Sequence, residues 1–265
     1  MTGMTAGSGL REVAARLAAA GVASPEWDAR VLLERAGSTG DLETSVRRRV
    51  AREPLQHITG IAWFRHLALA VGPGVFVPRP ETELVVDAAL DAIAAVERPL
   101  VVDLCAGSGA IGLSIAHERA AAGRAVEVHL VEADPGAVPW LRRNTAAIAA
   151  DSGVVHETDL ADDLGLPRLV DVVTANPPYL VEGTELDPET AGHDPAAALW
   201  GGTDGLDVIR PVIGAAARLL RPGGTLVVEH DSTHDLAPLL TSGWHDVQRH
   251  DDLTGRPRYS TAVRA

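Results

Sequence analysis

Residues 100–112 read LVVDLCAGSGAIG, and they decide the fold. The apolar run from Leu100 to Leu104 is typical of a buried strand, and the glycines that follow it mark a tight turn. We expect a helix from Gly109 to about Ala122. A strand that passes through a glycine-rich turn into a helix is the first unit of an α/β sheet.

The chain after Pro99 repeats this alternation of strand and helix. The sequence predicts strands at Leu100–Leu104, Val126–Val131, Val154–His156, Val170–Thr174, Thr225–Glu229, Asp246–Arg249 and Tyr259–Val263. It predicts helices near Gly109–Ala122, Pro135–Ala150, Asp204–Leu220 and Ser232–Thr241. Such alternation indicates a parallel sheet covered on both faces, and the turn at 252–255 makes the last two strands a hairpin. We therefore predict an α/β fold with a seven-stranded, doubly wound, Rossmann-like sheet and one antiparallel strand.

The glycines after the first strand fit a dinucleotide site. Gly107, Gly109 and Gly112 satisfy the pattern G-x-G-x-x-G, and Glu132 follows 20 residues later at the end of the next strand. An acidic residue at that place binds ribose hydroxyls in dinucleotide-binding enzymes. A nicotinamide-dependent dehydrogenase is therefore one hypothesis.

Asp103 favours a different cofactor. In a dinucleotide site the pyrophosphate lies on the helix N-terminus, and a carboxylate four residues before Gly107 would repel it. A carboxylate suits a cation that carries an amino group, as S-adenosylmethionine does. In this hypothesis Glu132 binds the ribose hydroxyls, Asp159 and Leu160 lie beside the adenine, and the glycines allow close backbone approach. Each acid taken alone is also consistent with a solvated strand end.

A second stretch, DVVTANPPY at 171–179, pairs a buried strand with a stiff polar loop. Proline fixes the backbone on both sides of Pro177 and supplies no N–H, so the loop offers mainly acceptors. These are the Asn176 side-chain oxygen and the carbonyls of Asn176 and Pro177, which suit an NH2 group. Tyr179 adds a flat ring that can pack on a planar amide or base. The alternative is a proline stop after a core strand, with no function.

A single cysteine and a pair of histidines suggest a chemical role less strongly. Cys105 is the only cysteine, so the chain can form neither an internal disulfide nor a cysteine-based zinc site. A helix N-terminus can lower a thiol pKa, but we interpret Cys105 as a small residue that lines the cofactor. His230 and His234 are four residues apart, a spacing that suits metal binding on a helix. A strand-to-helix turn is the better interpretation, and we predict no metal.

Composition excludes several classes of protein. The 265 residues carry 36 acidic and 23 basic side chains, all of the latter arginine, for a formal net charge of −13. That charge argues against a phosphate-backbone binder and favours a basic protein partner, so we expect no direct nucleic-acid binding. Neither a signal peptide nor an 18-residue apolar run is evident. We expect a soluble, cytoplasmic protein with no membrane contact.

The chain before the sheet divides into two parts. Apolar residues recur at three- and four-residue steps from Leu10 to about Arg52, which predicts three short helices. Residues 56–82 are interrupted by glycine and proline but are too apolar for a disordered linker, so they predict a connector with a hairpin. We therefore predict a helical domain at 1–55, this connector at 56–82 and the cofactor-binding sheet domain at 83–265.

Three further segments indicate a family. Residues 53–60 read EPLQHITG, residues 76–83 read FVPRPETE, and residues 193–207 read HDPAAALWGGTDGLD. Together with DLCAGSG and NPPY, they resemble the release-factor glutamine methyltransferases, the PrmC/HemK family, from about Leu10 to the C-terminus. Many adenine-N6 methyltransferases share NPPY, but they are not expected to carry the other segments.

The resemblance implies that S-adenosylmethionine donates a methyl group to the glutamine of the Gly-Gly-Gln motif in class I peptide chain release factors. It implies a Rossmann-like methyltransferase domain and a helical domain that helps to grip the factor. We expect a monomer. Asn176, Pro177 and Tyr179 are the implied catalytic residues, and with Pro178 they hold the glutamine. The implied cofactor site consists of Asp103, Cys105, Ala106, Gly107, Ser108, Gly109, Glu132, Asp159, Leu160 and Asn176.

This sequence departs from the family pattern in three places. Cys105 replaces a more usual glycine, Glu132 a more usual aspartate, and residues 229–231 read Glu-His-Asp where many members read Glu-Ile-Gly. Alternatives remain open: methylation of another glutamine protein such as a ribosomal protein, an adenine-N6 nucleic-acid methyltransferase, and a binding protein that keeps the fold without turnover.

Overall fold

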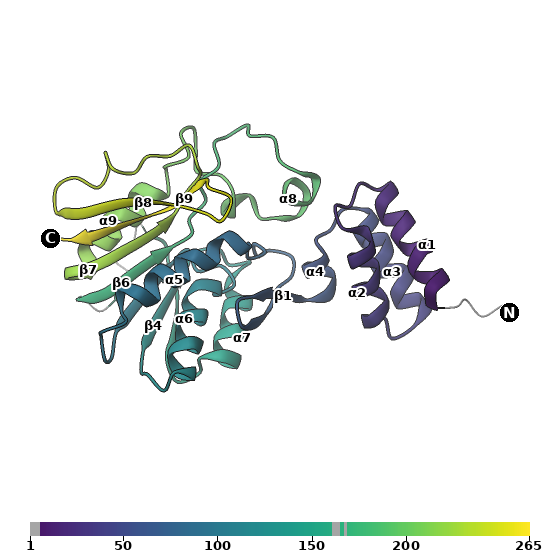
Figure 1. Cartoon of the computed structure of the whole chain (residues 1–265), viewed down its shortest axis with the longest axis horizontal. Helices are drawn as coiled ribbons and strands as arrows, with labels where there is room; N and C mark the ends of the chain where they lie inside the picture. The colour runs from purple at the N-terminus through teal and green to yellow at the C-terminus, as the bar shows by residue number, and fades with distance from the viewer. Residues whose placement is uncertain (1–5, 161–164, 167–168) are drawn as a thin grey trace.

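The structure is a computed structural model that describes residues 6–160, 165–166 and 169–265. Three parts follow one another along the long axis of the molecule (Figure 1): a helical bundle at the N-terminal end, a short connector, and a large sheet domain. The bundle packs α1, α2 and α3 around a small apolar core. Their bounds are Ala6–Ala19, Pro25–Arg35 and Thr39–Val50. The core side chains are Val13, Ala14, Leu17, Val22, Ala29, Leu32 and Val46.

The connector consists of one turn of helix and an antiparallel hairpin. Gly60 ends the helix in the left-handed region, with φ 74°, and the hairpin starts at the next residue. Phe64 and Leu69 of the hairpin are buried in the main core of the sheet domain, so the hairpin is packed as part of that domain. The connector elements are α4 (Leu55–Thr59), β1 (Ile61–Phe64), β2 (Leu67–Ala70) and the 3-10 turn η1 (Pro80–Thr82).

The sheet has seven strands in the order β5-β4-β3-β6-β7-β9-β8. β9 runs opposite to the other six strands of this sheet, so the predicted sheet with one antiparallel strand is confirmed. The order reverses between β3 and β6, and open α/β sheets bind ligands at such a switch point. The strands are β3 (Leu100–Leu104), β4 (Glu127–Glu132), β5 (Gly153–Glu157), β6 (Val170–Ala175), β7 (Leu220–Glu229), β8 (Trp244–Asp251) and β9 (Pro257–Arg264).

Helices cover both faces of the sheet because successive strand side chains point to opposite faces. Val101 packs in one core with α5, α6, α7 and the hairpin, whereas Val102 packs in the other core with α9. Each core buries apolar side chains, and this burial stabilises the domain. The helices are α5 (Glu83–Ala92), α6 (Ala110–Ala121), α7 (Val138–Ile148) and α9 (Ile209–Leu219).

One predicted helix is wrong, and several short elements lie where none was predicted. Residues 232–241 form turns and irregular chain. Pro238 lies within this range; it has no N–H to donate, and its ring would clash with the carbonyl four residues before it in a helix. Besides α4, the unpredicted elements include α8 (Pro188–His193) and the 3-10 turn η2 (Ala196–Ala198).

Candidate functional site

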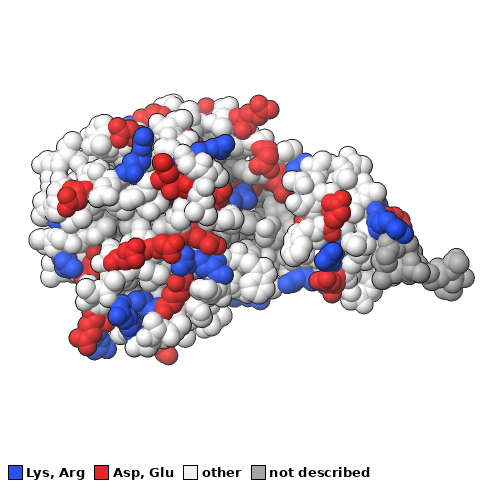
Figure 2. All heavy atoms as spheres, viewed as in Figure 1, with Lys and Arg blue, Asp and Glu red and all other residues white. Residues whose placement is uncertain are grey.

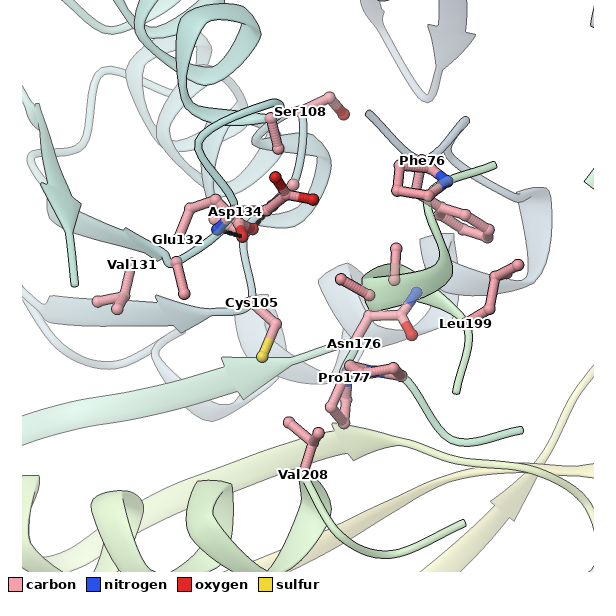
Figure 3. Close-up of a pocket in the computed structure, with 18 of the residues that line it drawn as sticks. Phe76, Cys105, Ser108, Val131, Glu132, Asp134, Asn176, Pro177, Leu199 and Val208 are labelled. Atoms are coloured by element: carbon pink, nitrogen blue, oxygen red, sulfur yellow. Dashed lines mark hydrogen bonds between the residues drawn. The ribbon is translucent and has the colours of Figure 1, made fainter. Parts of the chain in front are cut away.

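A cavity of about 770 Å³ opens at the carboxyl edge of the sheet, where the loops after β3, β4, β5 and β6 meet the connector. Figure 3 shows two walls: Cys105, Ser108 and Glu132 lie on one side, and Phe76 and Asn176 lie on the other. The cavity therefore has room for two ligand groups that face each other.

The loop after β3 has left-handed backbone at Cys105, Gly107 and Gly109, with φ of 57°, 56° and 88°. A Cβ on Gly109 would lie 2.6 Å from Leu113 Cδ1, so only glycine lets the helix pack here. At Gly107 a Cβ would meet open space, and this residue leaves the backbone accessible from the cavity. Cys105 adopts a conformation that favours glycine, the residue more usual in the resembled family.

The Cys105 thiol lines the cavity (Figure 3). Burial, and then the nearby carboxylates of Glu132, Asp103 and Asp159, raise the pKa of this thiol well above its ordinary value. The helix N-terminus therefore does not produce a reactive thiolate, and the thiol stays protonated. This agrees with Cys105 as a small lining residue.

Asp103 lies behind the loop and outside the cavity lining. Its side chain is fully buried, Oδ1 accepts from the Thr174 hydroxyl at 2.7 Å, and Oδ2 accepts from the Gly112 N–H at 3.0 Å. Burial raises the pKa of the Asp103 carboxyl to about 7. This carboxyl fixes the glycine turn between β3 and α6, and its predicted contact with the cofactor stays a prediction.

Glu132, at the end of β4, lines the cavity and also holds its wall together. Oε2 accepts from the Gly107 N–H at 2.7 Å and Oε1 from the Asp134 N–H at 2.8 Å. Burial raises the pKa of the Glu132 carboxyl, and the backbone donors oppose that rise. A carboxylate has four lone-pair sites, so both oxygens keep acceptor capacity for hydroxyls.

Four of the remaining residues predicted for the cofactor also border the cavity, and one does not. Asp159 and Leu160 line it from the loop after β5, and Ala106 and Ser108 line it from the loop after β3. Gly109 lies at the start of α6 and is outside the lining.

Asn176 and Pro177 form the opposite wall, at the end of β6 (Figure 3). The Asn176 Nδ2 donates to the Thr82 hydroxyl oxygen at 3.1 Å. Nδ2 and Oδ1 lie on opposite sides of a planar amide, so this bond directs Oδ1 away from Thr82 and leaves it as an acceptor. Oδ1 is one of the acceptors that the sequence predicts for this loop.

Pro178 and Tyr179 complete the loop and also line the cavity. The Tyr179 hydroxyl donates to Glu229 Oε1 at 3.0 Å, in the interior of the domain. Burial and the Glu229 carboxylate raise the pKa of Tyr179 well above its ordinary value, so the phenol remains neutral. The ring is anchored at its polar end and fixes the direction of the loop.

Sequence reasoning assigned no role to four residues on the second wall: Phe76, Arg79, Thr82 and Leu199. The Arg79 guanidinium lies 4.9 Å from the centre of the Phe76 ring and makes an ion pair of 2.7 Å with Asp194. Three of the four residues belong to the segment FVPRPETE, so the signal was present as a motif. Their meeting with NPPY depends on tertiary packing that the sequence does not reveal.

The two histidines after β7 bond to different partners. His230 Nε2 lies 2.8 Å from the Ser260 hydroxyl, and His234 Nε2 lies 3.1 Å from the Asp204 carbonyl. Within residues 6–160, 165–166 and 169–265 no group of three acidic, histidine or cysteine side chains could hold a metal ion. In the same ranges no helix is long and apolar enough to cross a bilayer.

Two curated proteins are similar to this chain over almost its whole length. It is 46% identical over 272 residues to the release factor glutamine methyltransferase of Streptomyces coelicolor, and the alignment covers 94% of this chain and 95% of that protein. It is 43% identical over 276 residues to the release factor glutamine methyltransferase of Mycolicibacterium smegmatis, with 94% of each chain covered. Residues 56–189 also match a family described as "Conserved hypothetical protein 95".

A solved structure supports the fold. The 16S rRNA methyltransferase of T. Thermophilus, in complex with AdoMet and guanosine, aligns with a TM-score of 0.56 at 23% identity, covering 77% of this chain and 50% of that one. At that identity the likeness shows a shared methyltransferase fold. The curated relatives share a higher sequence identity with this chain, 46% and 43%, and their alignments cover both the helical bundle and the sheet domain. The chain therefore belongs to the family of the release factor glutamine methyltransferases.

Proposed function

We propose that this protein transfers a methyl group from S-adenosylmethionine to the side-chain amide nitrogen of the glutamine in the Gly-Gly-Gln motif of class I release factors. The observation that carries the proposal is the pair of facing walls. Glu132 and the turn around Gly107 form one wall, and Asn176 and Pro177 form the other. One wall suits a nucleoside with an amino-acid tail, and the other suits an amide.

The residues of the first wall fit S-adenosylmethionine. Glu132 offers carboxylate acceptors to a pair of ribose hydroxyls, and Gly107 presents an open backbone. Leu160 supplies an apolar surface beside which an adenine can lie. When bound, S-adenosylmethionine supplies a methyl group on a sulfonium; the amide nitrogen takes that methyl and loses one proton to water, and the sulfur keeps the bonding electron pair as a thioether.

The residues of the second wall orient the amide. An amide nitrogen is a poor nucleophile because its lone pair is delocalised, so its position matters more than its basicity. Asn176 Oδ1 and the Pro177 carbonyl accept its two N–H groups and hold the nitrogen toward the other wall. Phe76 lines the cavity beside this loop and offers a ring on which a flat amide can pack. Orientation of this kind lowers a barrier by up to roughly 7 to 11 kcal/mol in the best intramolecular cases.

The helical bundle lies where it can contact the protein that carries the glutamine. Arg49 and Arg52 on the bundle side both pair with Glu189 of α8, at 2.8 and 2.9 Å, and the next residue, Thr190, lines the cavity. A partner that reaches the cavity therefore passes beside the bundle, which serves to grip it. Acidic and basic side chains are interspersed on the face shown in Figure 2, and the formal net charge of −13 favours a basic protein partner over nucleic acid. The enzyme acts as a monomer in the cytoplasm, where release factors work.

Methylation with site mapping tests the proposal. The purified protein is incubated with a purified class I release factor and methyl-labelled S-adenosylmethionine, and the modified residue is located by mass spectrometry. A gain of one methyl group on the Gly-Gly-Gln glutamine is expected, and none on a matched factor whose glutamine is replaced by glutamate. Label on another residue, or none on the parent factor, would contradict the proposal.

A further inference from the structure

A second segment of the chain, residues 199–207, lies alongside the residues that follow NPPY. The Leu180 N–H donates to the Leu199 carbonyl at 2.9 Å, and the Gly201 N–H donates to the Leu180 carbonyl at 2.8 Å. These bonds pair the two stretches of backbone in the parallel sense. The chain that leaves the amide-binding loop therefore takes its position from the 199–207 segment.

Both stretches border the cavity at the wall that carries Asn176. Tyr179 lines it from the NPPY loop, Leu199 lines it from the 199–207 segment, and Val208 lines it directly after that segment. Figure 3 shows Leu199 and Val208 on the same side of the cavity as Asn176. A shift of the 199–207 segment would therefore move the wall that we assign to the glutamine amide.

Gly205 lies where this segment meets the amide-binding loop. A Cβ at this position would lie 2.5 Å from the Tyr179 carbonyl oxygen and 2.6 Å from the Cε1 and Nε2 atoms of His234. The backbone of Gly205 has φ 75°, a left-handed conformation that glycine adopts without strain. Gly205 therefore fills a narrow space beside the main chain of Tyr179 and one imidazole ring.

His234 holds the residue that precedes Gly205. It is 7% exposed, and its Nε2 lies 3.1 Å from the Asp204 carbonyl oxygen. A carbonyl oxygen can only accept, so Nε2 carries the proton and donates it to Asp204. Because the same ring borders Gly205, the hydrogen bond and the ring together limit how far the 199–207 segment can move.

We propose that Gly205 and His234 are positioning residues of the glutamine site, which act through the main chain of Tyr179 on the wall that holds the amide. This inference rests on the function proposed above. Neither residue belongs to the cavity lining, so each acts through the backbone that it touches. His234 thereby links two motifs of the sequence, GGTDGLD at 201–207 and NPPY at 176–179. A displaced wall misaligns the amide nitrogen, so it should slow methyl transfer more than it weakens cofactor binding.

Gly205→Ala tests the close contact, because an added methyl group must displace the Tyr179 carbonyl or the His234 ring. At saturating S-adenosylmethionine, we expect the single-turnover rate on the intact release factor to fall at least about tenfold, with the cofactor Kd within about twofold of the parent. Gly123→Ala is the matched control: its φ is 67° and a Cβ there meets open space, so it adds backbone strain alone and should leave the rate unchanged. A rate for Gly205→Ala within about twofold of the parent would overturn the inference.

His234 is tested by two side chains of similar length. His234→Gln keeps an N–H donor that can reach the Asp204 carbonyl, whereas His234→Met has no donor. We expect His234→Met to react about fivefold more slowly than the parent and His234→Gln to stay within about twofold of it. Equal rates in these two variants would overturn the inference for His234, and this comparison holds even if Gly205→Ala does not fold.

Backbone hydrogen exchange gives a measurement that requires no substrate. In Gly205→Ala and His234→Met the amide protons of Leu180 and Gly201 should exchange faster than in the parent, while those of β3 stay protected. Faster exchange across the whole sheet would indicate general destabilisation and overturn the inference, as would unchanged exchange at Leu180 and Gly201. If the variants show the local change but the parent methylates no release factor, the proposed function is contradicted and the positioning of the loop is not.

Discussion

Glu132 has two roles: it holds the cofactor loop and it faces the cavity. Its carboxylate accepts the Gly107 and Asp134 N–H groups and also faces the cavity. The backbone bonds hold the loop in the shape that the cofactor meets. Loss of this side chain should therefore affect cofactor binding through both the missing acceptor and the relaxed loop.

We expect Glu132→Ala to weaken S-adenosylmethionine binding by about 1 to 3 kcal/mol, the usual range for a lost charged hydrogen-bond partner. Titration calorimetry measures the change. Glu127→Ala is the matched control, because Glu127 is an exposed residue at the opposite end of the same strand. An unchanged Kd for Glu132→Ala would mean that the carboxylate contacts only the protein.

Asp103 makes folding stability depend on pH. Burial raises its pKa in the folded protein from 3.8 to about 7, so the folded state holds the proton more tightly than the unfolded state does. The associated stability is fully present below the unfolded pKa and is lost as pH rises through the folded pKa. Between pH 5 and pH 8 this amounts to roughly 2 to 3 kcal/mol.

Asp103→Asn removes this titration and keeps the shape. Chemical denaturation of parent and variant at pH 5 and pH 8 should show the unfolding free energy of the parent falling more steeply than that of the variant. Glu229 titrates in both proteins, so its effect cancels in the comparison, whereas the coupling between Asp103 and Glu132 is part of the difference measured. Identical pH dependence of parent and variant would show that Asp103 is not a buried, proton-binding group.

For single residues, the sequence predicts which side chains border the cavity. It predicts less well which side chains contact one another. The pattern DxxxGxG indicates the loop, but it does not reveal that Asp103 pairs in register with Thr174 and so turns inward. Contact between Thr82 and Asn176, 94 positions apart, is likewise invisible before the chain folds. Such pairs depend on strand register and domain packing, which local patterns do not determine.

Among the elements, α7 links the hairpin to the cofactor loop through one side chain. Asn144 is 2% exposed, its Oδ1 accepts the Ala70 N–H at 2.8 Å, and its Nδ2 donates to the carbonyls of Ala70 at 3.0 Å and Ser108 at 2.9 Å. Three backbone groups from two segments, one buried and two partly buried, therefore depend on one amide.

We expect Asn144→Ala to lower the free energy of unfolding by about 2 to 4 kcal/mol, because it leaves several buried polar groups without partners. It should also weaken cofactor binding, since Ser108 belongs to the loop. Denaturant titration and calorimetry measure the two effects. Arg143→Ala, at the exposed neighbouring position, should change neither, and a similar result for both variants would refute this role.

Element prediction succeeded where periodicity is strong. The seven strands were identified because apolar runs bounded by turn residues recur along the domain. The helix expected at 232–241 is wrong, and Pro238 within this range has no N–H for a helical hydrogen bond. Helix α8 was missed because it is only six residues long, although the Asp187 side chain caps it by accepting from the Glu189 and Thr190 N–H groups.

In the whole molecule, the helical bundle and the sheet domain meet through charged contacts. The Arg49 side chain is nearly buried and bridges Asp28 of the bundle to Glu189 of the sheet domain. The hairpin of β1 and β2 contributes Phe64 and Leu69 to the main core of the sheet domain. A separated sheet domain must therefore include the hairpin, and Pro54, just before α4, is a suitable first residue.

A fragment that begins at Pro54 should bind S-adenosylmethionine as tightly as the full chain, because the cavity lining starts at Gly74. It should methylate an intact release factor at least about tenfold more slowly, because it lacks the bundle's contacts with the factor. A short Gly-Gly-Gln peptide, too small to reach the bundle, is the matched substrate and should be methylated equally by both. Equal rates on the intact factor would show that the bundle plays no part in recognising the factor.

The central claim is that the loop at 176–179 orients the glutamine amide for attack. Single-turnover methylation of the release factor by Asn176→Ala, at saturating S-adenosylmethionine, tests it most directly. We expect a rate loss of at least about a hundredfold, near 2.7 kcal/mol of transition-state stabilisation, with the cofactor Kd only modestly weaker. A rate within about threefold of the parent, well under 1 kcal/mol, would contradict the account and reduce NPPY to a structural stop after β6.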